Sequence, residues 1–277
     1  MSASSVIFKL TVIGEVLFVI FVLIGDSQKI ILNSILWKKL GDIEQNTLVH
    51  IPSLFIPLLL IFLFRLDFEK HGLSIRNANL ALSIALSAYL PALVARLPIA
   101  LTNYTKLSGG IIIAIAHLLA LVIWAWKFQK DFNPKVGIIA IILSAISFLW
   151  FSYSQNILPK FNQMAWSFTG MLFAALCEEV LWRGYIQTRL NEAFGTPFTF
   201  LGISWGWGLV ISSILFGFVH VLNQNPTTNQ IGWYWGWGIW TMCAGLFYGF
   251  LREKTGGVLA PFLAHGLPQA IAIAFGL

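Results

Sequence analysis

Long apolar runs separated by short polar stretches make up most of the chain. A helix of about 20 apolar residues crosses the hydrocarbon core of a bilayer. The pattern therefore predicts an all-α, polytopic membrane protein, with about eight or nine transmembrane helices around an intramembrane polar cavity. The expected spans, with ends placed to within roughly 2 to 4 residues, are 8–25, 48–65, 79–100, 109–127, 137–153, 164–182, 200–222, 231–251 and 257–277.

Three segments refine this pattern. The stretch KIILNSILWKKLGDIE, residues 29–44, mixes charged and apolar residues at helical spacing, which favours a helix lying on the bilayer surface. The glycines of GTPFTFLGISWG, residues 195–206, predict a loop or a short half-helix, with the helix proper starting near Trp207. At 1.5 Å per residue, His220 then lies at mid-depth. The stretch IGWYWGWGIW, residues 231–240, is typical of an interfacial aromatic belt.

Composition agrees with a membrane protein. The chain is 58% hydrophobic and 10% charged, with a mean hydropathy of +0.80, which excludes an ordinary soluble domain. Its net charge of +6 comes from Lys and Arg in short runs between apolar stretches, which favours the positive-inside pattern over nucleic-acid binding. Of the 17 Lys and Arg, ten fall on the cytoplasmic side and five on the other if the N-terminus is cytoplasmic, leaving Arg96 and Arg183 within spans. We expect that orientation, in the cell (inner) membrane.

Ionisable residues at membrane depth cost at least ~2.5 kcal/mol, so each needs a partner or a function. Glu15, Arg96 and His117 stand alone in apolar spans, and each could snorkel to the interface, pair across helices or line a packed interior.

The segment CEEVLWRG, residues 177–184, carries three charges after an apolar run. Glu179 and Arg183 stand at i and i+4, the favourable order for an ion pair. Glu178 is rotated by about 100° from its neighbour and has no partner on its own helix. One carboxylate is therefore anchored and the other is available.

Two histidines follow in apolar surroundings. FGFVH ends at His220, and LAPFLAHGLPQA places His265 and Gln269 at i and i+4. Glu178 with His220 could deprotonate a water molecule, while His265 and Gln269 donate hydrogen bonds to an oxyanion.

Two other mechanisms use the same region. Glu178, His220 and His265 could instead hold a divalent metal such as zinc, whose water attacks, although no HExxH motif is present. A nucleophilic Cys177 is disfavoured because the adjacent Glu178 opposes its thiolate.

The order EExxxR, then FxxxH, then the His265 helix resembles the CPBP (Abi) family of CAAX proteases and bacteriocin-processing enzymes, which includes the type II CAAX prenyl endopeptidase. The resemblance covers roughly residues 164–275. It implies intramembrane proteolysis, with Glu178 as the water-activating base, His220 assisting it and His265 stabilising the oxyanion. Glu179 and Arg183 would orient the site. Residues 161–277 would form the catalytic core, and residues 1–160, which carry no recognised motif, the N-terminal helices of the same membrane domain.

The third motif departs from the family pattern. Gln269 stands where the family usually has Asn, and Pro268 before it bends the helix or frees a carbonyl group. The longer side chain has more rotamer freedom to lose. Both features favour slow catalysis or a role without cleavage.

Three functions follow from these observations. The first is an endopeptidase that cuts a lipidated, prenylated, membrane-inserted or leader-bearing substrate, with zinc as the one conceivable cofactor. The alternative is a weak or inactive family member that acts as a membrane scaffold or assembly factor. The third is a transporter or channel with a charge relay, against which the absence of inverted repeats argues. The oligomeric state stays open.

Overall fold

The computed structural model describes residues 3–26, 42–128, 133–156, 164–165, 167–224 and 231–275. Most of these residues are helical. The α-helices are α1 (Ala3–Asp26), α2 (Asp42–Leu63), α3 (Ala78–Leu101), α4 (Leu107–Ile123), α5 (Pro134–Ser154), α7 (Leu172–Glu179), α8 (Thr188–Phe194), α9 (Trp207–Val221), α10 (Trp235–Thr255) and α11 (Leu259–Ala274). Wider π-helical segments occur at η2 (Trp124–Phe128), η3 (Ser167–Met171) and η4 (Val180–Gln187).

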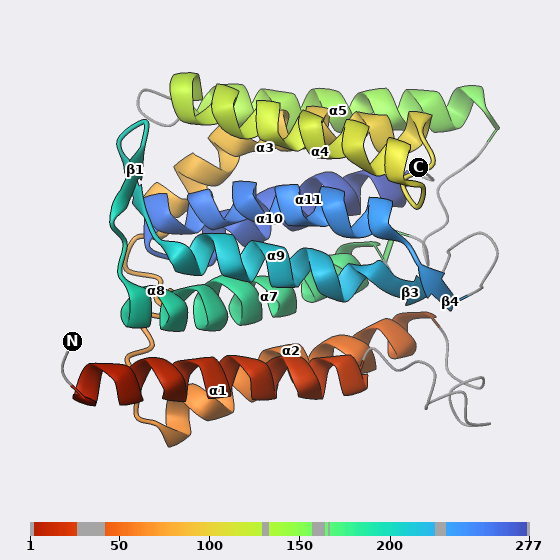
Figure 1. Cartoon of the computed structure of the whole chain (residues 1–277). Coiled ribbons are helices and arrows are strands. Elements are labelled where there is room, and N and C mark those ends of the chain that lie inside the picture. Colours follow the sequence, from red (N-terminus) through yellow and green to blue (C-terminus); the bar gives the residue numbers. More distant parts are fainter. Residues whose placement is uncertain are drawn as a thin grey trace.

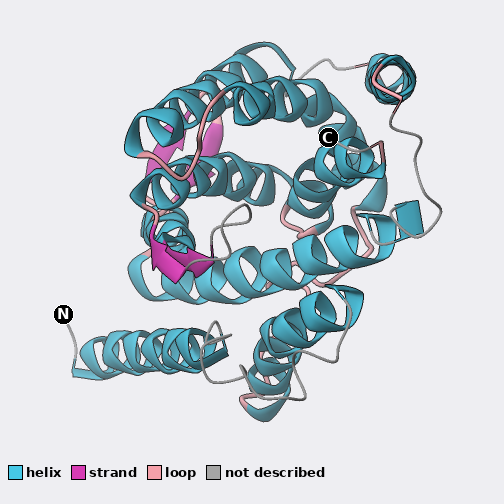
Figure 2. Ribbon diagram, turned by 90° about the vertical axis from the view of Figure 1, so that its right-hand side faces the viewer, coloured by secondary structure: helices cyan, strands magenta, loops and turns pink. Residues whose placement is uncertain are grey.

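The helices lie side by side in layers (Figure 1). Helices α4 and α5 lie on one side and α1 and α2 on the opposite side, with α9, α10 and α11 between them. After a quarter turn, the N-terminal helix lies at the edge of the bundle (Figure 2). The C-terminal helices that carry the sequence motifs therefore occupy the interior of the arrangement.

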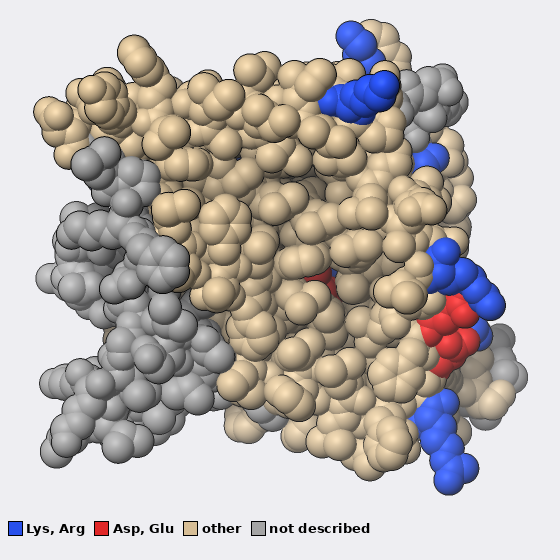
Figure 3. Space-filling model, turned by 180° about the vertical axis from the view of Figure 1, so that it is seen from behind, with Lys and Arg blue, Asp and Glu red and all other residues tan. Residues whose placement is uncertain are grey.

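The outer surface is apolar over a broad band. Among the described residues, four helical segments are long and apolar enough to cross a membrane: Ser4–Phe21, Ala78–Leu101, Leu107–Phe128 and Pro134–Ser154. Large apolar side chains such as Phe21, Trp126 and Trp150 are more than two-thirds exposed, which suits contact with lipid rather than water. In the space-filling view the middle of one face is apolar, and charged side chains gather towards one end (Figure 3). The prediction of a helical membrane protein is confirmed.

Two of the basic residues expected on one side of the membrane, Lys70 and Arg252, are in contact, and a third, Lys9, packs on an aromatic ring. The Nζ atom of Lys9, near the start of α1, lies 5.5 Å from the centroid of the Phe194 ring at the end of α8. Arg252, near the end of α10, donates a hydrogen bond of 2.6 Å to the carbonyl of Lys70 in the α2–α3 loop. Which side of the membrane this end faces stays a prediction.

Several helix ends agree with the apolar runs. Helices α3 and α5 match the expected spans 79–100 and 137–153 within three residues at either end. Helix α5 starts at Pro134, and the Asn133 side chain accepts a hydrogen bond from the Lys135 amide as an N-cap. Most of the proposed surface helix 29–44 lies outside the described residues, and residues 42–44 belong to α2.

Several expected boundaries are wrong. Helices α1 and α2 begin five and six residues before the expected spans 8–25 and 48–65. The span expected at 164–182 continues to Phe194, partly as π-helix. The segment before Trp207 is neither loop nor half-helix but a hairpin of β1 (Phe198–Phe200) and β2 (Ile203–Trp205). Its two turn residues, Leu201 and Gly202, have φ of 47° and 84°, as a type I′ turn requires. Helix α9 does start at Trp207, after an extended Gly206.

The aromatic stretch 231–240 has two parts. Strand β4 (Ile231–Trp233) pairs with β3 (Leu222–Gln224), and the exposed rings of Trp233 and Trp235 stack at 6.4 Å, as an interfacial belt would allow. Trp237, by contrast, faces inward and contacts the ring of His220.

Glycines allow α4 to approach α10 closely. A Cβ atom added at Gly110 would lie 2.1 Å from the carbonyl oxygen of Gly236. Small residues of this kind let helices in a membrane approach each other along their backbones. This contact fixes α10 against the N-terminal half of the chain.

We expect Gly110→Ala to lower the free energy of unfolding by about 1–3 kcal/mol, because the methyl group must push α4 away from α10. Gly14→Ala is the matched control, since an added Cβ there meets nothing within 4 Å. Thermal melts in detergent would compare them. Equal melting temperatures of the two variants would contradict the close packing.

Candidate active site

The first motif lies at a change of helix type. Glu178 and Glu179 end α7, and Arg183 lies in the π-helical segment η4. Single π-helical stretches inside α-helices are frequent at functional sites. Because the turn is wider there, side chains do not follow the 100° spacing assumed from the sequence, yet Glu179 and Arg183 still meet.

Glu179 is fully buried and has two partners. Its Oε2 lies 3.2 Å from Nε of Arg183, an ion pair that is misaligned for a hydrogen bond. Its Oε1 accepts a hydrogen bond of 2.9 Å from Nδ1 of His265 in α11. One buried carboxylate thus connects the first motif to the third.

Arg183 extends this connection to two more helices. Its Nη2 donates a hydrogen bond of 3.1 Å to the carbonyl of Gly245 in α10. Its guanidinium carbon lies 4.5 Å from the centroid of the Phe216 ring in α9, a cation–π contact. A charge that would be costly inside a membrane protein is therefore held by an anion, a carbonyl group and a ring.

Glu178 lies among histidines. Its Oε1 is 3.5 Å from Nε2 of His50 in α2, and its Oε2 is 3.8 Å from Nε2 of His265. It also interacts electrostatically with His220. Its side chain keeps 19% of its surface exposed, and acidic atoms are visible in a hollow within the apolar face (Figure 3). Of the two adjacent carboxylates, Glu178 is the accessible one.

His220 is oriented by its own helix. Its Nδ1 lies 2.6 Å from the carbonyl oxygen of Phe216, one turn earlier, and the Phe216 ring meets it edge-on at 4.7 Å. If Nδ1 carries the hydrogen that this bond needs, Nε2 has a free lone pair. His220 can then accept a proton at Nε2.

Gln269 has different partners from those expected. Its Oε1 accepts a hydrogen bond of 3.2 Å from Nη1 of Arg96 in α3, and its Nε2 donates one of 3.3 Å to the sulfur of Met171. Pro268 lies inside α11 without ending the helix. The amide is next to the site on the same helix as His265, but its hydrogen bonds lead away from Glu178.

The structure thus brings together Glu178, Glu179, Arg183, His220 and His265 and places Gln269 beside them. Sequence reasoning missed His50 and Tyr248, and it left Arg96 as a lone polar residue. His50 stands at the start of the second apolar run, and a titratable side chain there could have marked it as a candidate site residue. Tyr248 gave no signal of its own.

The other isolated polar residues are held by local or cross-helix bonds. Glu15 accepts two hydrogen bonds from Arg189, of 2.9 and 3.0 Å, and one from Tyr185. His117 is fully buried and bonds through Nδ1 to the carbonyl of Ile113. Of the alternatives that the sequence left open for Glu15, the structure shows pairing across helices.

Among the described residues, no three His, Cys, Asp or Glu side chains are grouped so that they could hold a metal ion. The set Glu178, His220 and His265 does not fit a metal centre in this arrangement. Cys177 is fully buried, which leaves its thiol little access to a substrate.

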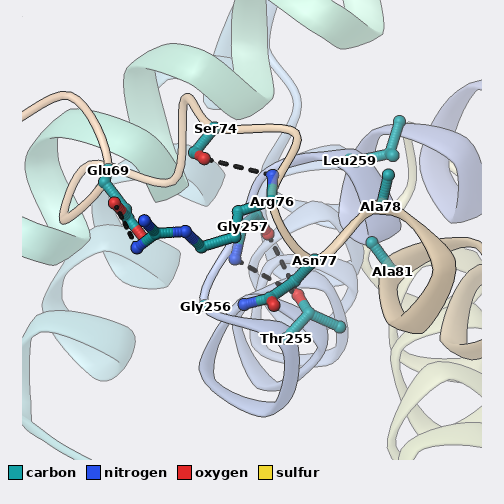
Figure 4. Close-up of a pocket in the computed structure, with 10 residues that line it drawn as sticks. All are labelled: Glu69, Ser74, Arg76, Asn77, Ala78, Ala81, Thr255, Gly256, Gly257 and Leu259. Atoms are coloured by element: carbon teal, nitrogen blue, oxygen red, sulfur yellow. Dashed lines mark hydrogen bonds and ion pairs between the residues drawn. The ribbon is translucent and has the colours of Figure 1, made fainter.

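A small pocket, open to solvent, lies elsewhere, where the α2–α3 loop meets the turn between α10 and α11 (Figure 4). Arg76 and Glu69 form an exposed ion pair at its rim. None of the motif residues lines it. This pocket is not the expected intramembrane polar cavity.

Taken together, the fold and the site define a helical membrane protein with a buried Glu–His–Arg network beside an accessible carboxylate. Residues 160–271, about two-fifths of the chain, match the family model described as Type II CAAX prenyl endopeptidase Rce1-like. The C-terminal segment is therefore similar to that family, which confirms the resemblance inferred from the motifs. No curated protein and no solved structure matches the chain.

We expect Glu179→Gln to destabilise the protein by about 3–5 kcal/mol, because it leaves the buried charge of Arg183 without its anion. Glu69→Gln removes the same charge from an ion pair whose side chains are 74% and 50% exposed, and should have little effect. Thermal melts of both variants test this. A loss in Glu179→Gln no larger than in Glu69→Gln would contradict the buried network.

Proposed function

We propose that this protein is an intramembrane endopeptidase in which Glu178 activates water. The observation that carries the proposal is the accessible Glu178 carboxylate with His50 at one oxygen and His265 at the other. The Rce1-like match supports the reaction class at the level of the family.

In the first step Glu178 accepts a proton from a water molecule while the water oxygen attacks the carbonyl carbon of a peptide bond. The carbonyl π electrons move to its oxygen. Nε2 of His265 can donate to this oxyanion only when it carries a proton, while Nδ1–H stays with Glu179. The buried Glu179 therefore holds the ring in place for this role, and the Gln269 amide is the second donor on the same helix.

In the second step the carbon–nitrogen bond breaks as the oxyanion re-forms its carbonyl. The departing nitrogen takes a proton from the Glu178 carboxyl, directly or through Nε2 of His220. Glu178 is thereby restored as a carboxylate. The cycle therefore adds no net charge to the apolar interior.

The substrate we propose is a membrane-associated peptide or protein, prenylated or carrying a leader. The site lies inside an apolar bundle, and Glu178 is the accessible carboxylate of the pair. A segment already in the bilayer can therefore reach it without crossing bulk water.

We expect Glu178→Gln to lower cleavage of membrane-anchored test peptides, prenylated or leader-bearing, by at least about 100-fold. The protein should still fold and insert, because Glu178 is not the carboxylate that holds Arg183. Turnover by purified protein in liposomes is the measurement, with and without chelator. Unchanged turnover would exclude Glu178 as the base.

The same assay addresses the other readings of the site. Activity lost on chelation and restored by zinc would favour the metal mechanism. If a variant lacking Glu178, His220 and His265 still rescues a deletion strain, the protein acts as a scaffold or assembly factor, and the proposal is wrong.

We further expect His50→Gln to reduce kcat by about 10-fold or more, because His50 contacts the base and fixes one of its oxygens. His71→Gln is the control, since His71 is buried and lies in the α2–α3 loop, bonded to the carbonyl of Asp67. Equal kcat in both variants would remove His50 from the active site.

A further inference from the structure

Arg96 reaches the active site from outside the Rce1-like segment. It lies in α3, and its guanidinium makes hydrogen bonds to two side chains of the C-terminal helices. Nη2 donates a hydrogen bond of 2.9 Å to the hydroxyl of Tyr248, and Nη1 donates one of 3.2 Å to Oε1 of Gln269. An arginine in an apolar span is costly, so its retention calls for a specific partner or role.

Tyr248 connects Arg96 to His265. The Tyr248 ring stacks on the His265 ring, with centroids 4.8 Å apart and planes inclined by 14°. Because Arg96 holds the hydroxyl end of this ring, it limits sliding or rotation of the stack. The imidazole is thus fixed from two directions: Glu179 at Nδ1 and Tyr248 at its face.

Gln269 is oriented by the same guanidinium. Arg96 carries only donors, so the amide must turn its oxygen towards it and its NH₂ group away. The NH₂ group then meets the sulfur of Met171, a weak acceptor. A developing oxyanion is a stronger acceptor and would take the amide hydrogen bond from that sulfur. The extra length of Gln, compared with the usual Asn, is used in reaching Arg96.

We propose that Arg96 is a positioning residue, which sets the orientation of His265 through Tyr248 and of the Gln269 amide directly. The inference rests on the proposed function of the site. The planar fork of the guanidinium holds two acceptors at a fixed separation, which the single ammonium group of a lysine does not reproduce. Arg96 makes no described contact with Glu178 and takes no part in proton transfer.

Steady-state kinetics on Arg96→Met and Arg96→Lys in liposomes, corrected for the folded fraction, test the proposal. We expect kcat to fall about 10- to 100-fold in Arg96→Met with KM nearly unchanged, and Arg96→Lys to recover only part of the loss. Arg252→Met is the matched control, because the side-chain hydrogen bonds of that buried arginine go to Lys70 and Thr188 and not to Tyr248 or Gln269. It should lower the melting temperature and leave kcat per folded molecule unchanged.

A double-mutant cycle shows whether Arg96 acts through its neighbours. In a protein that already carries Gln269→Met and Tyr248→Phe, adding Arg96→Met should lower kcat much less than Arg96→Met does in the unaltered protein. An Arg96→Met protein with unaltered kcat, or with the same loss in both backgrounds, would overturn the proposal.

One readout is independent of cleavage. In spectra of protein labelled with ¹⁵N-histidine, the ring resonances of His265 should shift in Arg96→Met and stay in place in Arg252→Met. If the unaltered protein cuts no test peptide but the shift occurs, the proposed function fails and the positioning by Arg96 stands. If the His265 resonances do not shift in Arg96→Met, the positioning role of Arg96 is contradicted, whether or not the protein cleaves a test peptide.

Discussion

The fully buried carboxylate of Glu179 is the interaction on which the site depends. It joins Arg183 on its own helix to His265 on α11, and Arg183 in turn contacts α9 and α10. A buried ion pair adds little net stability, because desolvation offsets most of its attraction. Its value here is specificity: a packing that separated these helices would leave a charge in an apolar interior without a partner.

With Glu179 engaged, its neighbour Glu178 is left accessible among imidazoles. The two carboxylates are adjacent in sequence and have opposite environments, one fully buried and one partly exposed. The N-terminal half of the chain completes the surroundings, since His50 reaches Glu178 from α2 and Arg96 reaches Gln269 from α3. The Rce1-like segment holds the motifs, but its site is supported by helices outside that segment.

Much of the fold could be predicted, because the long apolar runs form helices apart from the short strands at 198–205 and 231–233. The start of α9 at Trp207 and the pairing of Glu179 with Arg183 follow from local spacing alone. The position of His50 beside Glu178 depends on how α2 packs against α7, which no local pattern encodes. The orientation of Gln269 was missed for the same reason. Its partner Arg96 is 173 residues away in the sequence.

The most direct test of the account is a distance measured in bilayers. Rotational-echo solid-state NMR on ¹⁵N-histidine and ¹³C-carboxyl-glutamate protein reports the separation of imidazole nitrogens from carboxyl carbons. The account predicts that Nδ1 of His265 lies within ion-pair range, about 4 Å, of the Glu179 carboxylate. It also predicts that Glu179→Gln abolishes this dipolar contact, whereas Glu178→Gln leaves it in place. A separation beyond about 10 Å, the scale of a whole pocket, would contradict the central claim.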